Sequence, residues 1–282
     1  MDVERFSTTL VHNKKQIRNS IMTDKKLTKT QETKLAAVSS FEQDGGLGQE
    51  NMSKDDYVIP RLKILQALSE QINSIDGAKA GMIIDSVEEN LIAGDVGLAV
   101  LPIAYAKIHL EWQPRKAGGG LAGVHKADYD LTNCTRNDRG EYVTPEGNTI
   151  MPTAEYYVYV IKEDGTYSPY ALSMHGSQIK KSRKWNTMIN QLRLPKSNGE
   201  GTFNPAMFYR SYKLESVPES NDQGNWFGWK ITGDKNVTEI DDGAQMYQDA
   251  KAFRDQIVSG EVKTAKHDGD AKASEDDADA PF

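Results

Sequence analysis

The hydrophobic pattern is clearest where apolar and polar side chains alternate, which predicts β-strands. In residues 96–112 (VGLAVLPIAYAKIHLEW) the alternation runs from Ile103 to Leu110, and a period of two places alternate side chains on one face of a strand. Residues 154–174 contain two β-rich runs around Asp164-Gly165. That dipeptide favours a tight turn with positive φ at both residues, so an antiparallel hairpin is predicted here.

A different period marks two helices. Within residues 176–194, four apolar side chains from Trp185 to Leu192 have the i, i+3, i+4, i+7 spacing of an amphipathic helix. Residues 244–260 predict a second, more polar helix. Residues 113–150 lack periodicity and predict a long loop. Apolar runs predict two further strands and one segment of strand or helix, at 206–217, 224–233 and 55–72.

Together these elements predict a mainly β (α+β) fold. Antiparallel hairpins are typical of small barrels, and we expect an OB-fold-like β-barrel core over residues 55–236 with one inserted amphipathic helix. A C-terminal helix is expected over 237–260. Residues 1–54 and the acidic residues 261–282 are too polar to bury a core and are predicted to be disordered.

The composition favours a soluble protein. The hydrophobic fraction is 38%, the mean hydropathy is −0.63, and the longest apolar run, at 98–106, is far shorter than the roughly 18 residues of a membrane helix. No apolar signal segment follows Met1, and a single cysteine, Cys134, excludes an internal disulfide. We expect a cytoplasmic protein without membrane contact, in the host cytoplasm if it is phage-encoded. The sequence leaves open whether translation starts at Met1 or Met22.

The net charge of −7 is unevenly distributed. Residues 267–282 carry six acids and one lysine, whereas residues 171–214 carry eight cations and the single acid Glu200. Such asymmetry suggests nucleic-acid contact by one part of the chain and regulation or recruitment by another.

No motif points to catalysis, a metal or a cofactor. Gly118, Gly120 and Gly123 formally satisfy G-x-G-x-x-G, but the flanking sequence shows neither the strand nor the helix that a dinucleotide site needs. Cys134 and the scattered histidines have no metal-ligand spacing. We therefore expect a protein that is not an enzyme.

Clusters of cations and aromatic rings are typical of proteins that bind single-stranded DNA, because cations follow the phosphates and rings stack on bases. A single ring on a strand or on an apolar helix stripe is more often a core residue, but several such clusters coincide in one basic segment of an acidic protein. The predicted DNA-binding residues are Trp112, Arg115, Lys116, Lys126, Tyr157, Tyr159, Lys180, Lys181, Arg183, Lys184, Arg193, Arg210, Tyr212 and Lys213.

The chain ends in EDDADAPF, an acidic run closed by an apolar ring. This end resembles the acidic tip of bacterial single-stranded DNA-binding proteins, in which acids precede an apolar residue, Pro and Phe. Ala280 replaces the larger apolar residue and Ala278 interrupts the acids, so partner affinity is expected to differ. The matching residues, predicted to bind a partner, are Asp276, Asp277, Asp279, Pro281 and Phe282.

The body, through RLKILQ, EWQPRKAGGGLAGVHK and IKKSRKWNTMINQL, resembles phage-encoded single-stranded DNA-binding proteins of large lytic podoviruses. The resemblance implies a protein that coats single strands in DNA replication and recombination. It further implies recruitment of a polymerase, helicase, primase or recombinase through the tip. A recombination mediator or annealing protein, and an acidic interaction protein that binds no DNA, remain alternatives.

Overall fold

The computed structural model describes residues 43–53, 56–138, 140–222 and 224–265. The chain divides into two units, Met1–Met52 and Ser53–Phe282. In the first unit, residues 43–52 form successive turns, such as the one closed by the Leu47 N–H on the Asp44 carbonyl at 3.1 Å. The predicted partner-binding residues, Asp276, Asp277, Asp279, Pro281 and Phe282, lie outside the described residues.

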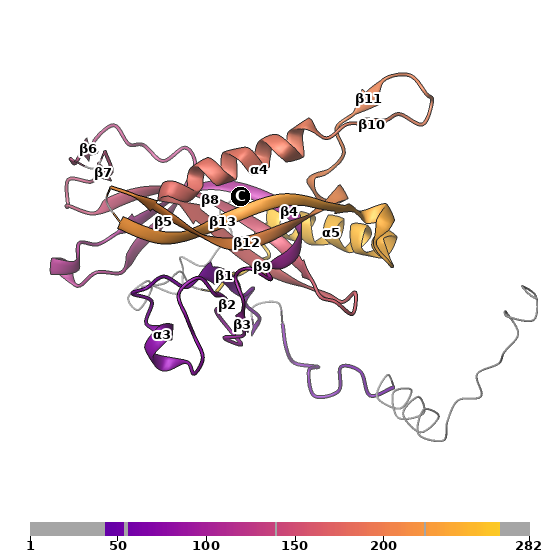
Figure 1. Cartoon of the computed structure of the whole chain (residues 1–282), viewed down its shortest axis with the longest axis horizontal. Coiled ribbons are helices and arrows are strands. Elements are labelled where there is room, and N and C mark those ends of the chain that lie inside the picture. The colour runs from indigo at the N-terminus through magenta and orange to yellow at the C-terminus, as the bar shows by residue number, and fades with distance from the viewer. Residues whose placement is uncertain (1–42, 54–55, 139, 223, 266–282) are drawn as a thin grey trace, which may run out of the picture. The chain divides into compact units, whose positions relative to one another are not determined.

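The second unit is built on one strongly curled sheet of eleven strands (Figure 1). The main strand order is β13-β12-β4-β8-β9-β1-β2-β3, with β5 paired to β4 and the β6–β7 hairpin paired to β8. The pairing of β1 with β9 is parallel and the others are antiparallel. The strands are β1 Arg61–Ile64, β2 Ile83–Asp85, β3 Leu91–Ile92, β4 Leu98–Trp112, β5 Leu121–Lys126, β6 Thr135–Arg136, β7 Tyr142–Val143, β8 Thr149–Ile161, β9 Tyr167–His175, β12 Arg210–Asn221 and β13 Gly224–Asn236.

Helices and a small hairpin complete the described part of this unit. The helices are α3 Gln71–Ser74, α4 Ile179–Gln191 and α5 Gly243–Val258, with 3-10 turns η2 Arg115–Ala117, η3 Gly176–Gln178, η4 Met207–Tyr209 and η5 Val237–Glu239. The hairpin of β10 (Leu194–Pro195) and β11 (Thr202–Phe203) projects beyond the C-terminal end of α4 (Figure 1). No helix in the described ranges is long and apolar enough to cross a membrane.

Both faces of the sheet are covered, each by one helix. On one face Tyr156 and Val158 of β8 pack with Trp185 of α4 in a buried cluster. On the other face Tyr157 of β8 belongs to a cluster with Phe253 of α5. Alternate residues of one strand therefore enter two separate cores, because a strand directs successive side chains to opposite faces.

The mainly β prediction is confirmed, and several local predictions need correction. Residues 113–150 are not simply a loop, since β5, β6 and β7 lie within them. In the hairpin between β8 and β9, Gly165 has a positive φ of 84° and Asp164 does not. The Asp164 carboxylate instead accepts the Thr166 N–H at 2.9 Å, an interaction that stabilises a turn without a left-handed aspartate.

The curl brings the outer edge of β13 to the far end of β1, where side chains connect them. The Gln66 amide accepts the Phe227 N–H at 2.9 Å and donates to the Phe227 carbonyl at 3.0 Å. Gln178 accepts the Trp229 N–H at 2.9 Å. These amides satisfy backbone groups that an edge strand would otherwise expose. We call this junction the seam.

Gly81 is required at the seam. Its φ is +89°, and a Cβ atom there would lie 2.5 Å from the Phe227 ring. A glycine therefore lets the turn before β2 (Ile83–Asp85) approach β13 closely.

Candidate nucleic-acid interface

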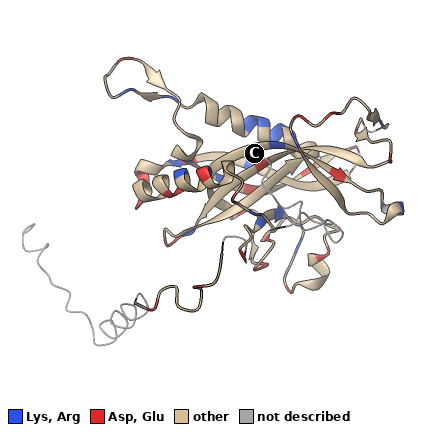
Figure 2. Cartoon of the chain, turned by 180° about the vertical axis from the view of Figure 1, so that it is seen from behind, with Lys and Arg blue, Asp and Glu red and all other residues tan. Residues whose placement is uncertain are grey.

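Helix α4 presents a cationic surface. Lys180, Arg183 and Lys184 are exposed, and their spacing of three and four places them on one side of the helix. The opposite side is held against the sheet by Trp185, whose ring stacks on Tyr156 at 4.4 Å between centroids. Figure 2 shows the basic residues gathered on this helix.

The position of these cations is unfavourable for the helix itself. They lie in the first two turns of α4, which has no acidic residue in its first turn and no basic residue in its last. The N-terminal end of a helix carries partial positive charge, so cations there lower helix stability while anions bind favourably. Stability does not explain the placement.

Lys181 has a different environment from its neighbours. Its ammonium forms an ion pair with Glu219 of β12, which also accepts the Trp226 indole N–H at 3.0 Å. Burial alone would raise the pKa of Glu219, but hydrogen bonds from Lys181 and Trp226 outweigh it, and the pKa lies below its usual value. Lys181 thus attaches α4 to the β12–β13 hairpin.

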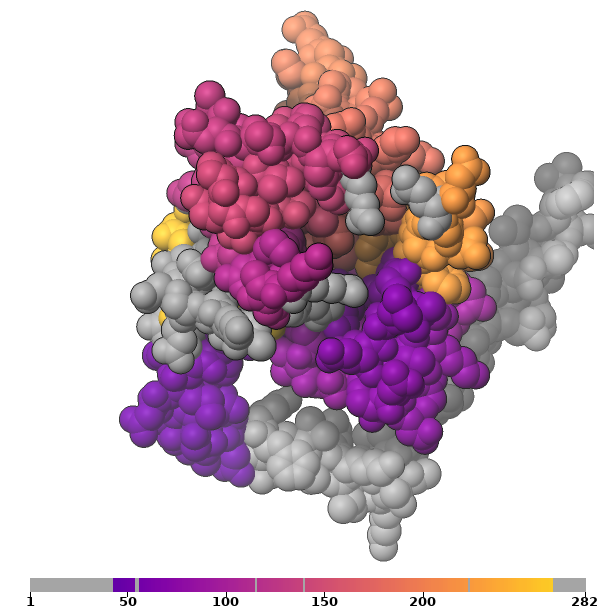
Figure 3. Space-filling view, turned by 90° about the vertical axis from the view of Figure 1, so that its left-hand side faces the viewer, coloured from indigo at the N-terminus to yellow at the C-terminus, as the bar shows by residue number. Residues whose placement is uncertain are grey.

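A groove of about 290 Å³ lies at the seam beside the start of α4. Its aromatic walls come from Trp112 at the end of β4 and from Phe227 and Trp229 of β13. Figure 3 shows the face on which the orange β12–β13 end lies beside the indigo residues of β1–β3 and α3. The other lining residues are Arg61, Leu62, Lys63, Ile64, Gln66, Ser69, Ser86, Leu110, Ser173, His175 and Gln178.

The groove reaches the N-terminal end of α4. Gln178 lines the groove and immediately precedes α4, so Lys180 follows two residues after a groove residue. Trp112 lines the groove and leads into η2, where Lys116 is exposed; the side chain of Arg115 lies outside the described part. We call the groove together with Lys180, Arg183 and Lys184 the groove–helix surface.

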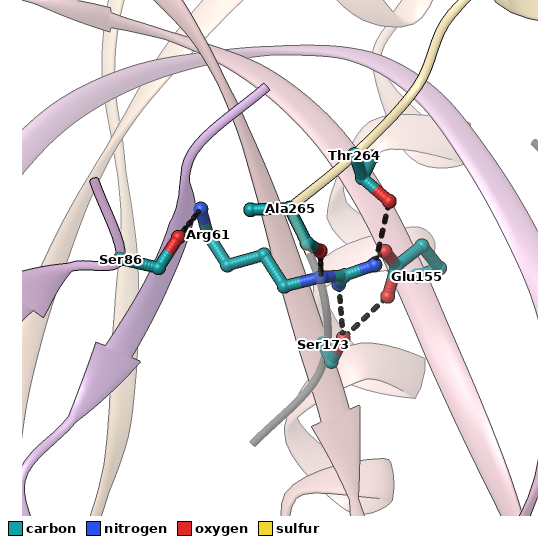
Figure 4. Close-up of polar contacts among 6 residues, drawn as sticks. All are labelled: Arg61, Ser86, Glu155, Ser173, Thr264 and Ala265. Carbon is teal, nitrogen blue, oxygen red and sulfur yellow. Dashed lines mark hydrogen bonds and ion pairs between the residues drawn. The ribbon is translucent and has the colours of Figure 1, made fainter. Parts of the chain in front are cut away.

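Arg61 fixes one wall of the groove (Figure 4). Its guanidinium donates to Glu155 Oε1 at 2.6 Å and to Ser173 Oγ at 3.0 Å, and Ser173 in turn donates to the Glu155 carboxylate. It also donates to the Thr264 hydroxyl at 2.9 Å and to the Ala265 carbonyl at 2.6 Å. Thr264 and Ala265, which belong to the segment predicted to be a disordered tail, are thereby held beside the groove.

The predicted stacking residues Tyr157, Tyr159 and Tyr212 are core residues, which corrects their assignment to a DNA-facing surface. Their exposed fractions are 1%, 7% and 2%. The clusters of cations and rings suggested that these tyrosines face DNA, but α4 and α5 cover both faces of the sheet. Burial raises the pKa of Tyr159 to about 12, consistent with a ring removed from water.

Other predicted cations lie away from the groove–helix surface or have structural contacts. Arg193 donates to the Asn190 and Leu192 carbonyls at 2.5 and 2.9 Å, so it caps the C-terminal end of α4. Arg210, half-buried, approaches the Asp234 carbonyl at 3.4 Å. Lys213 pairs with Glu215 at 3.4 Å, and Lys126 is exposed at the end of β5.

The glycine stretch does not form a nucleotide site. Gly118, Gly119 and Gly120 all have positive φ and form the connection from β4 to β5, which is closed by the Gln113 N–H on the Gly120 carbonyl at 2.9 Å. Gly123 lies within β5, so no helix begins there. Among the described residues, no group of three or more His, Cys, Asp or Glu side chains is arranged to hold a metal ion.

Sequence reasoning missed Phe227 and Gln66, which define the seam. Phe227 stood in a predicted strand between two tryptophans, and Gln66 is 161 residues away from it. Only the density of rings in GNWFGWK could have indicated a functional surface.

A family model described as Pam3 phage gp34-like protein matches residues 28–263. The chain belongs to this family. The matched range contains every strand and helix whose bounds are given in the description of the fold. The family name supports a phage origin for this gp34-like protein. No curated protein and no solved structure matches the chain.

Proposed function

We propose that this gp34-like protein binds single-stranded DNA without sequence preference and coats it during phage DNA replication and recombination. The observation that carries the proposal is the groove–helix surface, where exposed cations adjoin a groove with aromatic walls. Cations along the backbone and rings against the bases are the two elements that sequence-tolerant binding needs.

Phosphates are expected to follow Lys180, Arg183 and Lys184, with the N-terminal end of α4 adding to the attraction for anions. Double-stranded DNA keeps its bases stacked inside the duplex, so its rings cannot enter the groove. In this proposal the curled sheet acts like an OB-fold, and the single-stranded DNA binds along the seam.

The acidic tail has a proposed role in recruitment. Arg61 holds Ala265 at the groove wall, and the acidic residues follow Ala265 in the sequence. These acids are proposed to compete for the α4 cations. Pro281 and Phe282 are proposed to bind a polymerase, helicase, primase or recombinase.

Binding of fluorescent oligo-dT and of a duplex of equal length at several NaCl concentrations tests this function. We expect tighter binding of the single strand and a steep loss of affinity as salt rises. Equal affinity for both, or no binding at low salt, would contradict the proposal. Annealing of complementary oligonucleotides, measured in parallel, would identify a recombination mediator.

A second candidate function, protein interaction without DNA, is favoured by an apolar groove of about 690 Å³ at the base of the β10–β11 hairpin. It is lined by Leu194, Phe203, Tyr209, Ile240 and Tyr247 among others, and Phe203 is 44% exposed. Absence of DNA binding together with capture of a phage replication protein that depends on Phe203 would favour this function.

A further inference from the structure

We infer that the groove at the seam is a pocket for one unstacked nucleobase of the bound strand. This inference rests on the proposed function and adds a defined ligand and a defined site to it. The volume, about 290 Å³, is at the small end of ligand pockets, which span roughly 300–1,000 Å³. The pocket therefore suits a single ring system with its sugar and not several bases.

The walls of the pocket suit a flat ring. Trp112 comes from the end of β4 and Phe227 from β13, and only β12 lies between these two strands in the sheet. The lining also contains the apolar side chains of Leu110 and Ile64 and the ring of Trp229. Every nucleobase has a π-face that can stack on such rings, so this wall chemistry does not select a sequence.

One polar group in the pocket has no described partner. The indole Nε1 of Trp112 is buried and makes no hydrogen bond, although a buried donor without an acceptor is unfavourable. A base that enters the pocket would offer a ring nitrogen or carbonyl oxygen as the acceptor. Each base carries at least one such acceptor, so the contact is also tolerant of sequence.

Three of the polar side chains that line the groove are already engaged in hydrogen bonds with the protein. Gln66 is committed to both backbone groups of Phe227, and Gln178 accepts the Trp229 N–H. The Arg61 guanidinium is committed to Glu155, Ser173 and residues 264–265. These contacts fix the positions of Gln66, Gln178 and Arg61 in the groove wall.

The pocket also lies close to the cations that would bind the phosphates of the DNA. Gln178 ends the pocket wall and Lys180 lies in the first turn of α4. A nucleotide whose base occupies the pocket would therefore have its phosphate near exposed cations. Base capture and phosphate binding would act on the same nucleotide.

The test separates base binding from phosphate binding by comparing oligo-dT with an abasic oligomer of equal length. We expect wild-type protein to bind oligo-dT about tenfold more tightly, the order expected for one stacked base. Trp112→Ala and Phe227→Ala should remove that preference and leave affinity for the abasic oligomer unchanged. Phe203→Ala, which removes an exposed ring outside the pocket, is the matched control.

Trp112→Phe keeps an aromatic wall and removes the N–H, so it tests the hydrogen bond even if the alanine variants fail to fold. It should lower affinity for oligo-dT about threefold and leave abasic affinity unchanged. Equal wild-type affinity for both oligomers would overturn the pocket while leaving the DNA-binding proposal intact. Failure of wild-type protein to bind either oligomer at low salt would overturn both.

Discussion

Helices α4 and α5 pack on opposite faces of the same sheet but make different use of their residues. Helix α5 buries Gly243, Met246, Ala250, Phe253 and Ile257, and its two acids are balanced by two cations. Helix α4 buries only Ser182 and Trp185, and its charged residues are all basic. The difference indicates that α5 serves the core, whereas α4 has one large buried ring and presents three of its four cations to solvent.

The largest effect should come from the core of α5. Phe253→Ala removes a ring that stacks on Tyr159 at 5.5 Å between centroids, and it should lower the free energy of unfolding by about 3–5 kcal/mol. Urea unfolding followed by circular dichroism measures this. Val258→Ala, on the exposed side of α5, is the control and should cost much less. A similar loss in both variants would show that α5 is not a core element.

The next effect concerns α4 and should appear in binding but not in stability. The variant K180Q/R183Q/K184Q should weaken oligo-dT binding on the order of 10- to 100-fold. The slope of log affinity against log salt should become shallower by about 2, since each phosphate contact on a single strand contributes about 0.7. Thermal stability should stay constant or rise, because cations leave the N-terminal end of a helix.

The matched control for α4 is K235Q/K251Q/R254Q, which removes the same charge from exposed positions on α5 and at the end of β13. We expect a much smaller change in affinity and in the salt slope. If both triple variants weaken binding equally, net charge alone governs the interaction and the groove–helix surface has no special role.

The smallest effect should come from the contact that joins α4 to the β12–β13 hairpin. The pKa of Glu219 is lowered in the folded state, so its ion pair with Lys181 stabilises the protein above the ordinary glutamate pKa of about 4.3. That contribution is lost as pH falls through the lower folded pKa. We expect this ion pair to contribute about 1 kcal/mol or less to the free energy of unfolding, as other partly exposed ion pairs do.

Unfolding free energies of wild type and Glu219→Gln, measured from about pH 6 to pH 3, give this contribution. The two should differ at the upper end and converge at the lower end. A constant difference across the range would show that the carboxylate charge does not contribute.

The sequence predicted secondary structure correctly where a single local pattern, such as a helical period or a turn dipeptide, was present. The period of the residues around Trp185 predicted α4, and the two β-rich runs around Asp164-Gly165 predicted the β8–β9 hairpin. The cations of α4 were also predicted as a surface, and three of the four are exposed. Arg193 was predicted for the same role, but its position after α4 lets it reach the helix carbonyls.

The sequence by itself determined the long strands β4, β8, β9, β12 and β13, the amphipathic helix and the basic segment, because these depend on periods and charges among neighbouring residues. The tertiary structure alone decided which aromatic rings are accessible to a nucleobase. Tyr157 and Tyr159 are buried because a helix covers each face of the sheet, and Phe227 reaches Gln66 because the sheet curls. Contacts between residues so far apart depend on the path of the whole chain, which no local pattern records.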